Sequence, residues 1–363
     1  MQNNIFISTL LLLAFSAFAS ILVFNYSIKF SRRLGLVDKP NYRKVHRKPI
    51  PVVGGFAIGF SLLLVYAVSH HLQQFVAQHW AIAASLLVLL VMGIFDDKYS
   101  LSVKLRLGIE LLCAFAVAYS GIRLTSFHGL FGIQQLPVVM QYVVTIFLIV
   151  SITNAFNLMD GIDGLVGAVS LVNTVLLSFA FLVLGEYQWL YLMLPLLVSL
   201  LVFLSYNWNP AKIFMGDAGS LLLGFLFTAS GIFLIEKSFT VSAVNVRPEA
   251  IIILVSACLM IPVMDTIRVF VQRAKQGKSP FAADKTHLHH LFLSLNISHA
   301  NAAKKILLLH CAIIFSSILL IQWMSVSSVI MIQALMAMIY TVLLKFVNSF
   351  FHWFRFIRKY ELE

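Results

Sequence analysis

Charge is scarce in this chain. Only 11% of its 363 residues are charged, whereas 60% are hydrophobic and the mean hydropathy is +0.93. Soluble domains carry about 25% charged residues, so this composition excludes a water-soluble enzyme and indicates a protein surrounded by lipid. The net charge of +12 does not indicate nucleic-acid binding, because the basic residues stand in short connectors between apolar segments and form no continuous stripe.

Cysteine is also rare, and the motifs of common soluble enzymes are missing. The three cysteines, Cys113, Cys258 and Cys311, lie in apolar stretches without CxxC spacing, which argues against a disulfide framework or a zinc-thiolate site. There is no GxGxxG after a strand, no HExxH and no GxSxG. Gly277-Lys278-Ser279 resembles the end of a P-loop, but Gln272 stands where that motif needs glycine.

Long apolar runs are what the chain does have. Because about 20 apolar residues cross a bilayer as a helix, the pattern predicts an all-α, polytopic integral membrane protein with about 11 transmembrane helices (10–11). We expect a single transmembrane catalytic domain over residues 1–350 and a short tail over 351–363. The predicted segments are 5–24, 52–69, 80–95, 105–122, 138–153, 164–183, 187–206, 219–235, 250–267, 306–323 and 325–344.

Basic residues mark one side of the membrane. Only Arg123, Lys237 and Arg247 fall in one set of connectors, while the other 23 of the 26 Lys and Arg residues flank the second set or lie in the tail. Since cytosolic connectors are rich in Lys and Arg, we predict a bacterial inner-membrane protein with a periplasmic N-terminus and a cytosolic C-terminus. The predicted cytosolic loops are 31–51, 96–104, 154–163, 207–220 and 271–303.

Asp96 and Asp97 stand together where segment 80–95 ends. Adjacent carboxylates repel each other, and a divalent cation or a protonated phosphate would relieve that repulsion. A solvated helix end at the membrane boundary is an equally open alternative. In the next segment Arg106 and Glu110 have the i, i+4 spacing of a self-contained ion pair, and we assign them no catalytic role.

A polar repeat separates segments 138–153 and 164–183. Asn154, Asn157, Asp160 and Asp163 follow one another at three-residue spacing, together with two glycines that let a ligand approach the backbone. Each amide and carboxylate beside lipid needs a hydrogen-bonding partner. Mutual contacts between helices are one explanation, and the clustering favours the other, a ligand site.

Segment 207–220 brings together an amide, a cation, an aromatic ring and an acid in Asn207, Lys212, Phe214 and Asp217. A nucleotide diphosphate needs such parts: a ring for the base to stack on, a lysine for the phosphates and an aspartate for Mg²⁺. The alternative, a Gly/Pro turn with a snorkelling lysine, does not account for Asp217 between apolar flanks.

The longest connector, 271–303, contains His287, His289 and His290 among several Lys and Arg residues. Imidazoles beside cations favour a pyrophosphate ligand. Zinc is the lesser alternative, because no cysteine or spaced acid completes a tetrahedral set. A basic loop lying on anionic lipid head groups would explain the Lys and Arg residues without requiring three histidines.

Taken together, these segments resemble the polyprenyl-phosphate N-acetylhexosamine-1-phosphate transferase family. The resemblance runs from Asp38-Lys39-Pro40 to His290, in the family's order of motifs. It implies a Mg²⁺-dependent enzyme that transfers N-acetylhexosamine 1-phosphate, with GlcNAc 1-phosphate favoured, from a UDP-sugar to undecaprenyl phosphate and releases UMP. Such a reaction initiates cell-envelope glycan synthesis. The motifs that carry the resemblance are Pro51-Val52-Val53-Gly54-Gly55, the Asp-Asp pair, the Asn/Asp repeat, Phe-Met-Gly-Asp (214–217) and His-Leu-His-His (287–290).

The resemblance also implies roles for individual residues. Asp217, with Asp97 and Asp160, would hold Mg²⁺, or Mn²⁺ in its place, and Asp96 would deprotonate or orient the lipid phosphate. His290 would act at the pyrophosphate as a catalytic residue. Asp163 resembles the uracil contact, Phe214 the ring under uracil and Asn207 a nucleoside contact. The other implied substrate-binding residues are Asn157, Lys212, His287, His289, His46 and Lys48.

Two other functions stay open. Muramoyl-pentapeptide transferases carry Thr-Pro-Thr-Met-Gly-Gly and three successive histidines, where this chain has Ile50-Pro51-Val52-Val53-Gly54-Gly55 and an interrupted run. A membrane transporter is the distant alternative, and its carboxylates would lie near the bilayer midplane. The expected partners are the UDP-N-acetylhexosamine, undecaprenyl phosphate and membrane lipid, without nucleic acid. Monomer and homodimer both stay open, as do direct attack and a covalent aspartyl intermediate.

Overall fold

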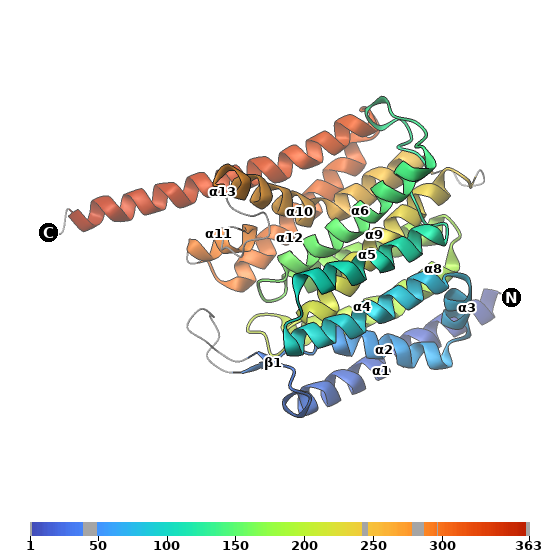
Figure 1. Cartoon of the computed structure of the whole chain (residues 1–363). Helices are drawn as coiled ribbons and strands as arrows, with labels where there is room; N and C mark the ends of the chain where they lie inside the picture. Colours follow the sequence, from blue (N-terminus) through green and yellow to red (C-terminus); the bar gives the residue numbers. More distant parts are fainter. Residues whose placement is uncertain (1, 39–48, 242–245, 278–286, 296, 361–363) are drawn as a thin grey trace.

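The computed structural model describes residues 2–38, 49–241, 246–277, 287–295 and 297–360, which form a bundle of long helices (Figure 1). In chain order the elements are α1 (Gln2–Leu34), β1 (Val37–Asp38), β2 (Ile50–Pro51), α2 (Gly54–Val68), α3 (His70–Gln78), α4 (Trp80–Tyr99), α5 (Val103–Tyr119), the 3-10 turn η1 (Leu130–Gly132), α6 (Val138–Met159), α7 (Leu165–Val183), α8 (Tyr187–Asn207), α9 (Gly216–Ser238), α10 (Pro248–Lys275), α11 (Leu288–Ser294), α12 (His299–Leu320) and α13 (Val326–Tyr360).

The helices confirm a polytopic membrane protein. Among the described residues, nine helices are long and apolar enough to cross a membrane, and the bent pair α2 and α3 makes ten if it counts as one span. The eleventh predicted segment, 105–122, falls on α5, which has 17 residues. At 1.5 Å per residue α5 is about 25 Å long, somewhat short of a hydrocarbon core of about 30 Å. The structure therefore gives nine or ten candidate spans in the described residues, and this agrees with the predicted 10–11 only if the bent pair is one span.

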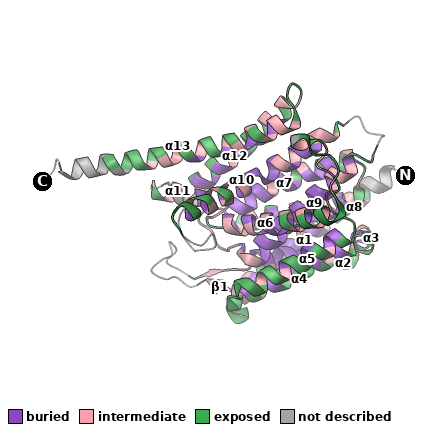
Figure 2. Ribbon diagram, turned by 45° about the horizontal axis from the view of Figure 1, so that its top comes forward, coloured by how far each residue is buried: buried purple, intermediate pink, exposed green. Residues whose placement is uncertain are grey.

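Helix α9 is the centre of the bundle. It packs against α2, α4, α6, α7 and α10, and 89% of its most apolar 18-residue stretch is buried, against 28–61% for the other candidate spans. Figure 2 shows buried residues inside the bundle and exposed ones along the outer faces of helices such as α13. A helix surrounded on all sides has little freedom to shift, so whatever its first turn carries is held in place from several directions.

Glycines let the backbone of α9 approach its neighbours closely. A Cβ atom on Gly55 of α2 would lie 1.9 Å from the Gly219 nitrogen, and one on Gly93 of α4 would lie 2.3 Å from the Ala218 Cα. Small residues at such crossings are how membrane helices pack tightly without a hydrophobic driving force. The close approach places the polar end of α4 directly beside the first turn of α9.

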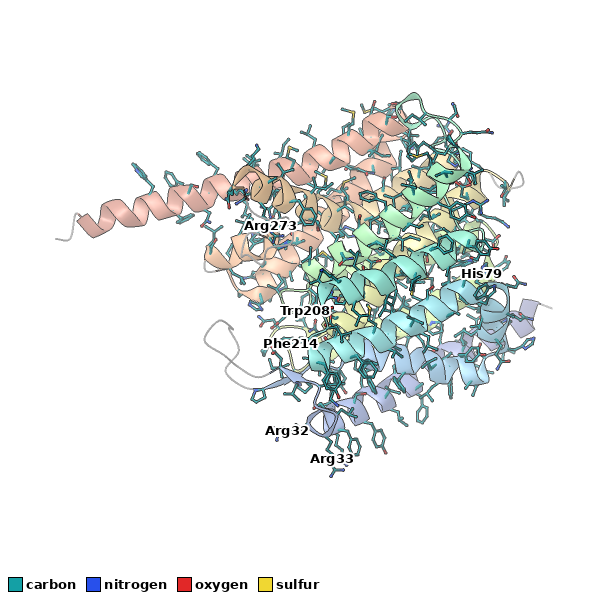
Figure 3. All side chains as sticks on the ribbon, viewed as in Figure 1. Arg32, Arg33, His79, Trp208, Phe214 and Arg273 are labelled. Carbon is teal, nitrogen blue, oxygen red and sulfur yellow. The ribbon has the colours of Figure 1, made fainter. Side chains whose placement is uncertain are left out.

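The two ends of the bundle differ in chemistry. We call one of them the carboxylate end, because Asp96, Asp97, Asp160, Asp163 and Asp217 lie there on α4, α9 and the loop after α6. Trp208 and Phe214 lie at this end, as do Arg32 and Arg33 at the end of α1, while His79 lies at the opposite end (Figure 3). The opposite end carries Glu186, Glu236 and Lys237, because α7 and α9 both start at the carboxylate end and run away from it.

Candidate active site

Two segments far apart in the sequence, 51–55 and 214–217, are hydrogen-bonded to each other at the carboxylate end. The Phe214 nitrogen donates to the Pro51 carbonyl at 2.8 Å, and the nitrogens of Gly54 and Gly55 donate to the carbonyls of Phe214 and Met215 at 2.9 and 2.8 Å. Val52 and Phe214 thereby form a short parallel bridge. The predicted motifs at 51–55 and 214–217 are therefore one structural unit that leads directly into α9.

Asp97 caps the N-terminus of α9. Its Oδ1 accepts the Asp217 amide at 2.8 Å and its Oδ2 accepts the Ala218 amide at 3.2 Å. Gly216, which precedes them, has a φ of +75°, and a Cβ there would lie 2.5 Å from Asp97 Oδ2. Only glycine takes that conformation without a steric penalty. The carboxylate satisfies amides that a helix start leaves unpaired and complements the positive end of the helix dipole.

Arg106 contacts residues of three of the predicted polar segments. The prediction of an Arg106–Glu110 ion pair is wrong. Its Nη1 lies 2.6 Å from Asp96 Oδ2 and 3.2 Å from Asp217 Oδ2, and its Nη2 donates to Asn157 Oδ1 at 3.3 Å. Glu110 instead accepts a hydrogen bond from Asn154. Because α5 packs between α4 and α6 (Figure 1), the long-range partners replace the local one, and Arg106 belongs to the site.

Asn157, in the last turns of α6, fixes the Asp217 carboxylate. Its Nδ2 donates to Asp217 Oδ1 at 2.5 Å and to Ser220 Oγ at 3.0 Å. Ser220 in turn donates to the Gly216 carbonyl at 3.0 Å. Asn154 and Asn157 thus lie within a helix rather than in the predicted connector. Their spacing places them on one face that meets both α5 and α9.

Asp160 comes directly after α6 and faces the same helix start. Burial and the neighbouring Asp217 carboxylate raise the pKa of Asp160 to about 7, although the Gly216 amide, which donates to it, acts in the opposite direction. A carboxylate with a raised pKa favours a bound cation, because the cation offsets the cost of ionising it. The acids Asp96 and Asp97, Asp160 and Asp217 come from three distant segments and lie together at the start of α9.

A second group of predicted residues lies in the adjoining loops. Asn207 is buried, accepts the Gly164 amide at 2.9 Å and donates to the Ile213 carbonyl at 2.8 Å, so it ties the loop before α7 to the loop before α9. Asp163 Oδ2 accepts the Ala211 amide at 3.1 Å, and its Oδ1 lies 3.3 Å from His299 Nδ1.

The aromatic rings and the lysine of segment 207–220 lie on the same side. A Cβ on Gly164, whose φ is +79°, would lie 2.9 Å from the Trp208 ring, so the glycine leaves room for that ring. Phe214 and Trp208 are both half-buried, and their side chains lie at the carboxylate end (Figure 3). The Lys212 side chain is exposed, while its amide donates to the Tyr206 carbonyl at 2.8 Å.

His287 is held by a residue that the sequence reasoning overlooked. Asp265 Oδ2 lies 3.0 Å from His287 Nδ1, while its Oδ1 accepts the Leu288 amide at 2.9 Å and lies 2.6 Å from Arg268 Nη2. His289 and His290 follow on α11, but their side chains lie outside the described residues, as do His46 and Lys48 in full. An ionisable residue inside an apolar helix is a functional candidate by default, and that signal would have found Asp265.

The fit of a metal ion can be judged from the carboxylate oxygens. Across the described ranges, no three His, Cys, Asp or Glu side chains are arranged to hold an ion on their own. Mg²⁺ often binds to only one or two carboxylates together with substrate phosphates. Asp217, with its neighbours at the start of α9, meets that requirement, so the site fits an ion that arrives with a diphosphate rather than a permanent metal centre.

The fold and this site define a multi-pass membrane protein with a polar reaction centre at one end of its helices. Comparison with known proteins identifies the class. The model of the family described as glycosyl transferase family 4 matches residues 79–235, a range that runs from α4 into α9 and contains Asp96, Asp97, Asp160 and Asp217.

Curated relatives match over most of their length. A Bacillus subtilis (strain 168) protein described as a probable undecaprenyl-phosphate N-acetylglucosaminyl 1-phosphate transferase is 34% identical over 289 residues, 79% of this chain and 78% of the relative. An undecaprenyl-phosphate alpha-N-acetylglucosaminyl 1-phosphate transferase of Yersinia pestis is 32% identical, covering 76% and 74%. The Escherichia coli (strain K12) protein of the same description is 29% identical, covering 83% and 80%. The chain belongs to glycosyl transferase family 4 and is a membrane phosphoglycosyl transferase.

Proposed function

We propose that the chain transfers N-acetylglucosamine 1-phosphate from UDP-N-acetylglucosamine to undecaprenyl phosphate and releases UMP, and that this reaction initiates a cell-envelope glycan. The relatives' descriptions name this sugar phosphate and this lipid. The observation that carries the proposal is the convergence of Asp96, Asp97 and Asp217 around the start of α9, with Asn157 and Asp160 beside them.

The start of α9 suits a diphosphate. A helix N-terminus presents unpaired amides and a partial positive charge, both of which favour phosphate groups. Asp97 accepts the Asp217 and Ala218 amides and Asp160 accepts the Gly216 amide, so the helix dipole and a bound cation, rather than these three amides, would attract the diphosphate. Phe214, exposed Lys212 and Trp208 precede the helix start by two, four and eight residues, so a ring for the base and a cation for a phosphate would both lie near it.

The divalent cation would be held by Asp217, with Asp96 next to it, and would neutralise charge on the diphosphate and on the departing UMP. Asn157 fixes the Asp217 carboxylate through a 2.5 Å hydrogen bond. Asp97 and Asp160, which the resemblance implies as further metal ligands, accept amides of α9 instead, so we assign them to support of this turn. Preorganised groups of this kind lower a barrier because they need not reorient as charge develops.

The acceptor phosphate has to be oriented more than deprotonated. A phosphate monoester has a second pKa of about 6, so its oxygen is already largely ionised at neutral pH. We therefore assign Asp96 to holding, with Asp217, the cation that would orient the acceptor phosphate, rather than to proton removal. The phosphate oxygen attacks the sugar-bearing phosphorus, and the bond from that phosphorus to the UMP oxygen breaks. A covalent aspartyl intermediate is the other route, and exchange of labelled UMP into UDP-sugar without lipid would reveal it.

The carboxylate end would face the cytosol, where UDP-sugars are present. Supporting this orientation, 23 of the 26 basic residues fall in the predicted cytosolic connectors and the tail. Labelling with a membrane-impermeant thiol reagent tests it. In a background without native cysteines, Lys212→Cys should react in inverted vesicles and stay unlabelled in intact spheroplasts, whereas Glu249→Cys should do the reverse.

A double-label experiment tests the reaction itself. The donor carries ³H in the sugar and ³²P in the phosphate bonded to it, and the purified protein in lipid nanodiscs is given undecaprenyl phosphate and Mg²⁺. Both labels should enter the lipid in equal amounts. Transfer of ³H without ³²P would contradict the proposal. The same assay with UDP-GalNAc and UDP-MurNAc-pentapeptide tests the choice of sugar, which is the part that depends most on the relatives.

A further inference from the structure

Arg106 lies against one oxygen of Asp96 and one oxygen of Asp217, and in both acids it is the oxygen that no amide engages. Asp96 Oδ1 accepts the Leu101 amide at 2.7 Å, both Asp97 oxygens accept amides of α9, and Asp217 Oδ1 accepts Asn157. The second oxygens of Asp96 and Asp217, their Oδ2 atoms, lie 2.6 and 3.2 Å from Arg106 Nη1. One guanidinium nitrogen thus bridges two carboxylates.

A divalent cation at Asp217 would need the same oxygens. Mg²⁺ binds carboxylate oxygens at about 2.0–2.1 Å and tolerates little distortion. Arg106 Nη1 therefore cannot share the space between the two acids with the ion. The guanidinium stays charged at every physiological pH, which means that it cannot yield its place by losing a proton. Arg106 and the cation therefore compete, and the guanidinium must move for the cation to bind both acids.

The donor's diphosphate is the natural destination for the displaced guanidinium. The guanidinium's planar set of N–H groups can bond two phosphate oxygens at once. The hydrogen bond from Arg106 Nη2 to Asn157 keeps the side chain beside the start of α9. Glu110, which stands one turn along α5, is already bonded to Asn154.

We propose that Arg106 competes with the divalent cation for Asp96 and Asp217 and pairs with the donor's diphosphate once the cation has taken them. This rests on the proposed function, because it assumes a UDP-sugar and a cation at this site. It has two consequences. The cation alone binds weakly, since it must displace Arg106, and the donor and the cation bind cooperatively, since each stabilises the arrangement that the other needs.

The test compares Arg106→Gln with Lys104→Gln, an exposed residue on the same helix. Mn²⁺ alone serves as the probe, because the electron paramagnetic resonance signal of free Mn²⁺ falls as the ion binds. In nanodiscs, Arg106→Gln should bind Mn²⁺ about tenfold more tightly than the wild type, while its KM for UDP-GlcNAc rises and its kcat falls. Lys104→Gln should match the wild type in all three quantities.

Weaker or unchanged Mn²⁺ binding in Arg106→Gln would overturn the proposal, because an arginine that only organises the acids would lose affinity when removed. If that variant does not fold, the wild type is tested instead. UDP-GlcNAc should tighten its Mn²⁺ binding at least about fivefold, and Mn²⁺ binding that does not depend on UDP-GlcNAc would overturn the proposal. The metal titration needs no turnover. Failure of the proposed function would instead appear as no transfer by the wild type in the double-label assay.

Discussion

The two ends of the bundle balance their charges differently. At the opposite end, Lys237 lies 2.8 Å from Glu186, and Glu236 accepts the Thr125 amide at 3.0 Å and its hydroxyl at 2.5 Å and lies 3.3 Å from His128. Each of these two acids has its own partners. At the carboxylate end, Asp96 and Asp217 share one arginine, Arg106, while Asp97 and Asp160 accept backbone amides at the start of α9.

This difference in how the acids are paired indicates a structural role for the opposite end and a functional role for the carboxylate end. Paired acids hold loops in place and need nothing further, whereas a surplus of acids in a partly buried site costs free energy unless a cation arrives. Functional sites are where such unfavourable arrangements persist. The carboxylate end therefore behaves as a site completed by its ligands, and the opposite end as a set of satisfied contacts.

Removal of divalent cations should have the largest effect. We expect EDTA to stop turnover and added Mg²⁺ or Mn²⁺ to restore it, because the acids at the start of α9 would otherwise face the diphosphate unscreened. Assay of transfer before and after chelation, with thermal unfolding measured in parallel, checks this. Full activity in EDTA would show that the surplus of acids has no catalytic purpose.

Asp217→Asn should lower kcat by about 10²–10³ or more while the protein still folds. The substitution removes one charge from a crowded group, so we expect thermal stability to stay equal or rise. Glu236→Gln is the matched control, since it makes the same chemical change at the other end of α9. It should keep activity and lose about 1 kcal/mol of stability as its hydrogen bonds weaken. The comparison between the two ends breaks down if the two variants behave alike.

Gly93→Ala tests the close approach that positions the first turn of α9. The new Cβ would lie 2.3 Å from the Ala218 Cα, and overpacking of this kind costs about 1–3 kcal/mol. We expect lower thermal stability and lower kcat together, because Ala218 follows Asp217. Gly108→Ala on α5 is the control, with no atom within 4 Å of its Cβ. A harmless Gly93→Ala would remove the argument that packing aligns the acids.

Glu186→Gln should have the smallest effect. The pair with Lys237 is partly exposed, and such pairs contribute about 0.2–1 kcal/mol. We expect a slight fall in unfolding temperature and no change in turnover, and a double-mutant cycle with Lys237→Gln isolates the pair's contribution. A marked loss of activity in either variant would mean that the opposite end takes part in the reaction.

The helices could be predicted from the sequence because apolar length is a local property. All eleven predicted segments fall on helices, since each needs only its own composition. The bend of 104° between α2 and α3 was not predicted. His70–Gln78 has too few apolar residues to resemble a span, and its position depends on packing against α8. The orientation in the membrane stays a prediction.

The site could be predicted in its acids but not in its connections. Asp96, Asp97, Asp160 and Asp217 were identified because carboxylates beside lipid are unusual. The position of Arg106 could not be derived, because its spacing to Glu110 offered a complete local explanation and only the packing of α5 reveals the other partners. The same applies to His299 beside Asp163 and to the capping of α9 by Asp97, which depend on contacts between distant segments. The roles of the predicted substrate-binding residues stay predictions.

The most direct measurement is UMP release by the purified protein in nanodiscs with UDP-GlcNAc, Mg²⁺ and undecaprenyl phosphate, compared between the wild type and Asp217→Asn. We predict that the wild type releases UMP in step with the lipid-linked product, and that Asp217→Asn releases almost none although it remains folded. Wild-type rates in Asp217→Asn, or no UMP from the wild type when lipid, donor and metal are all present, would contradict the account.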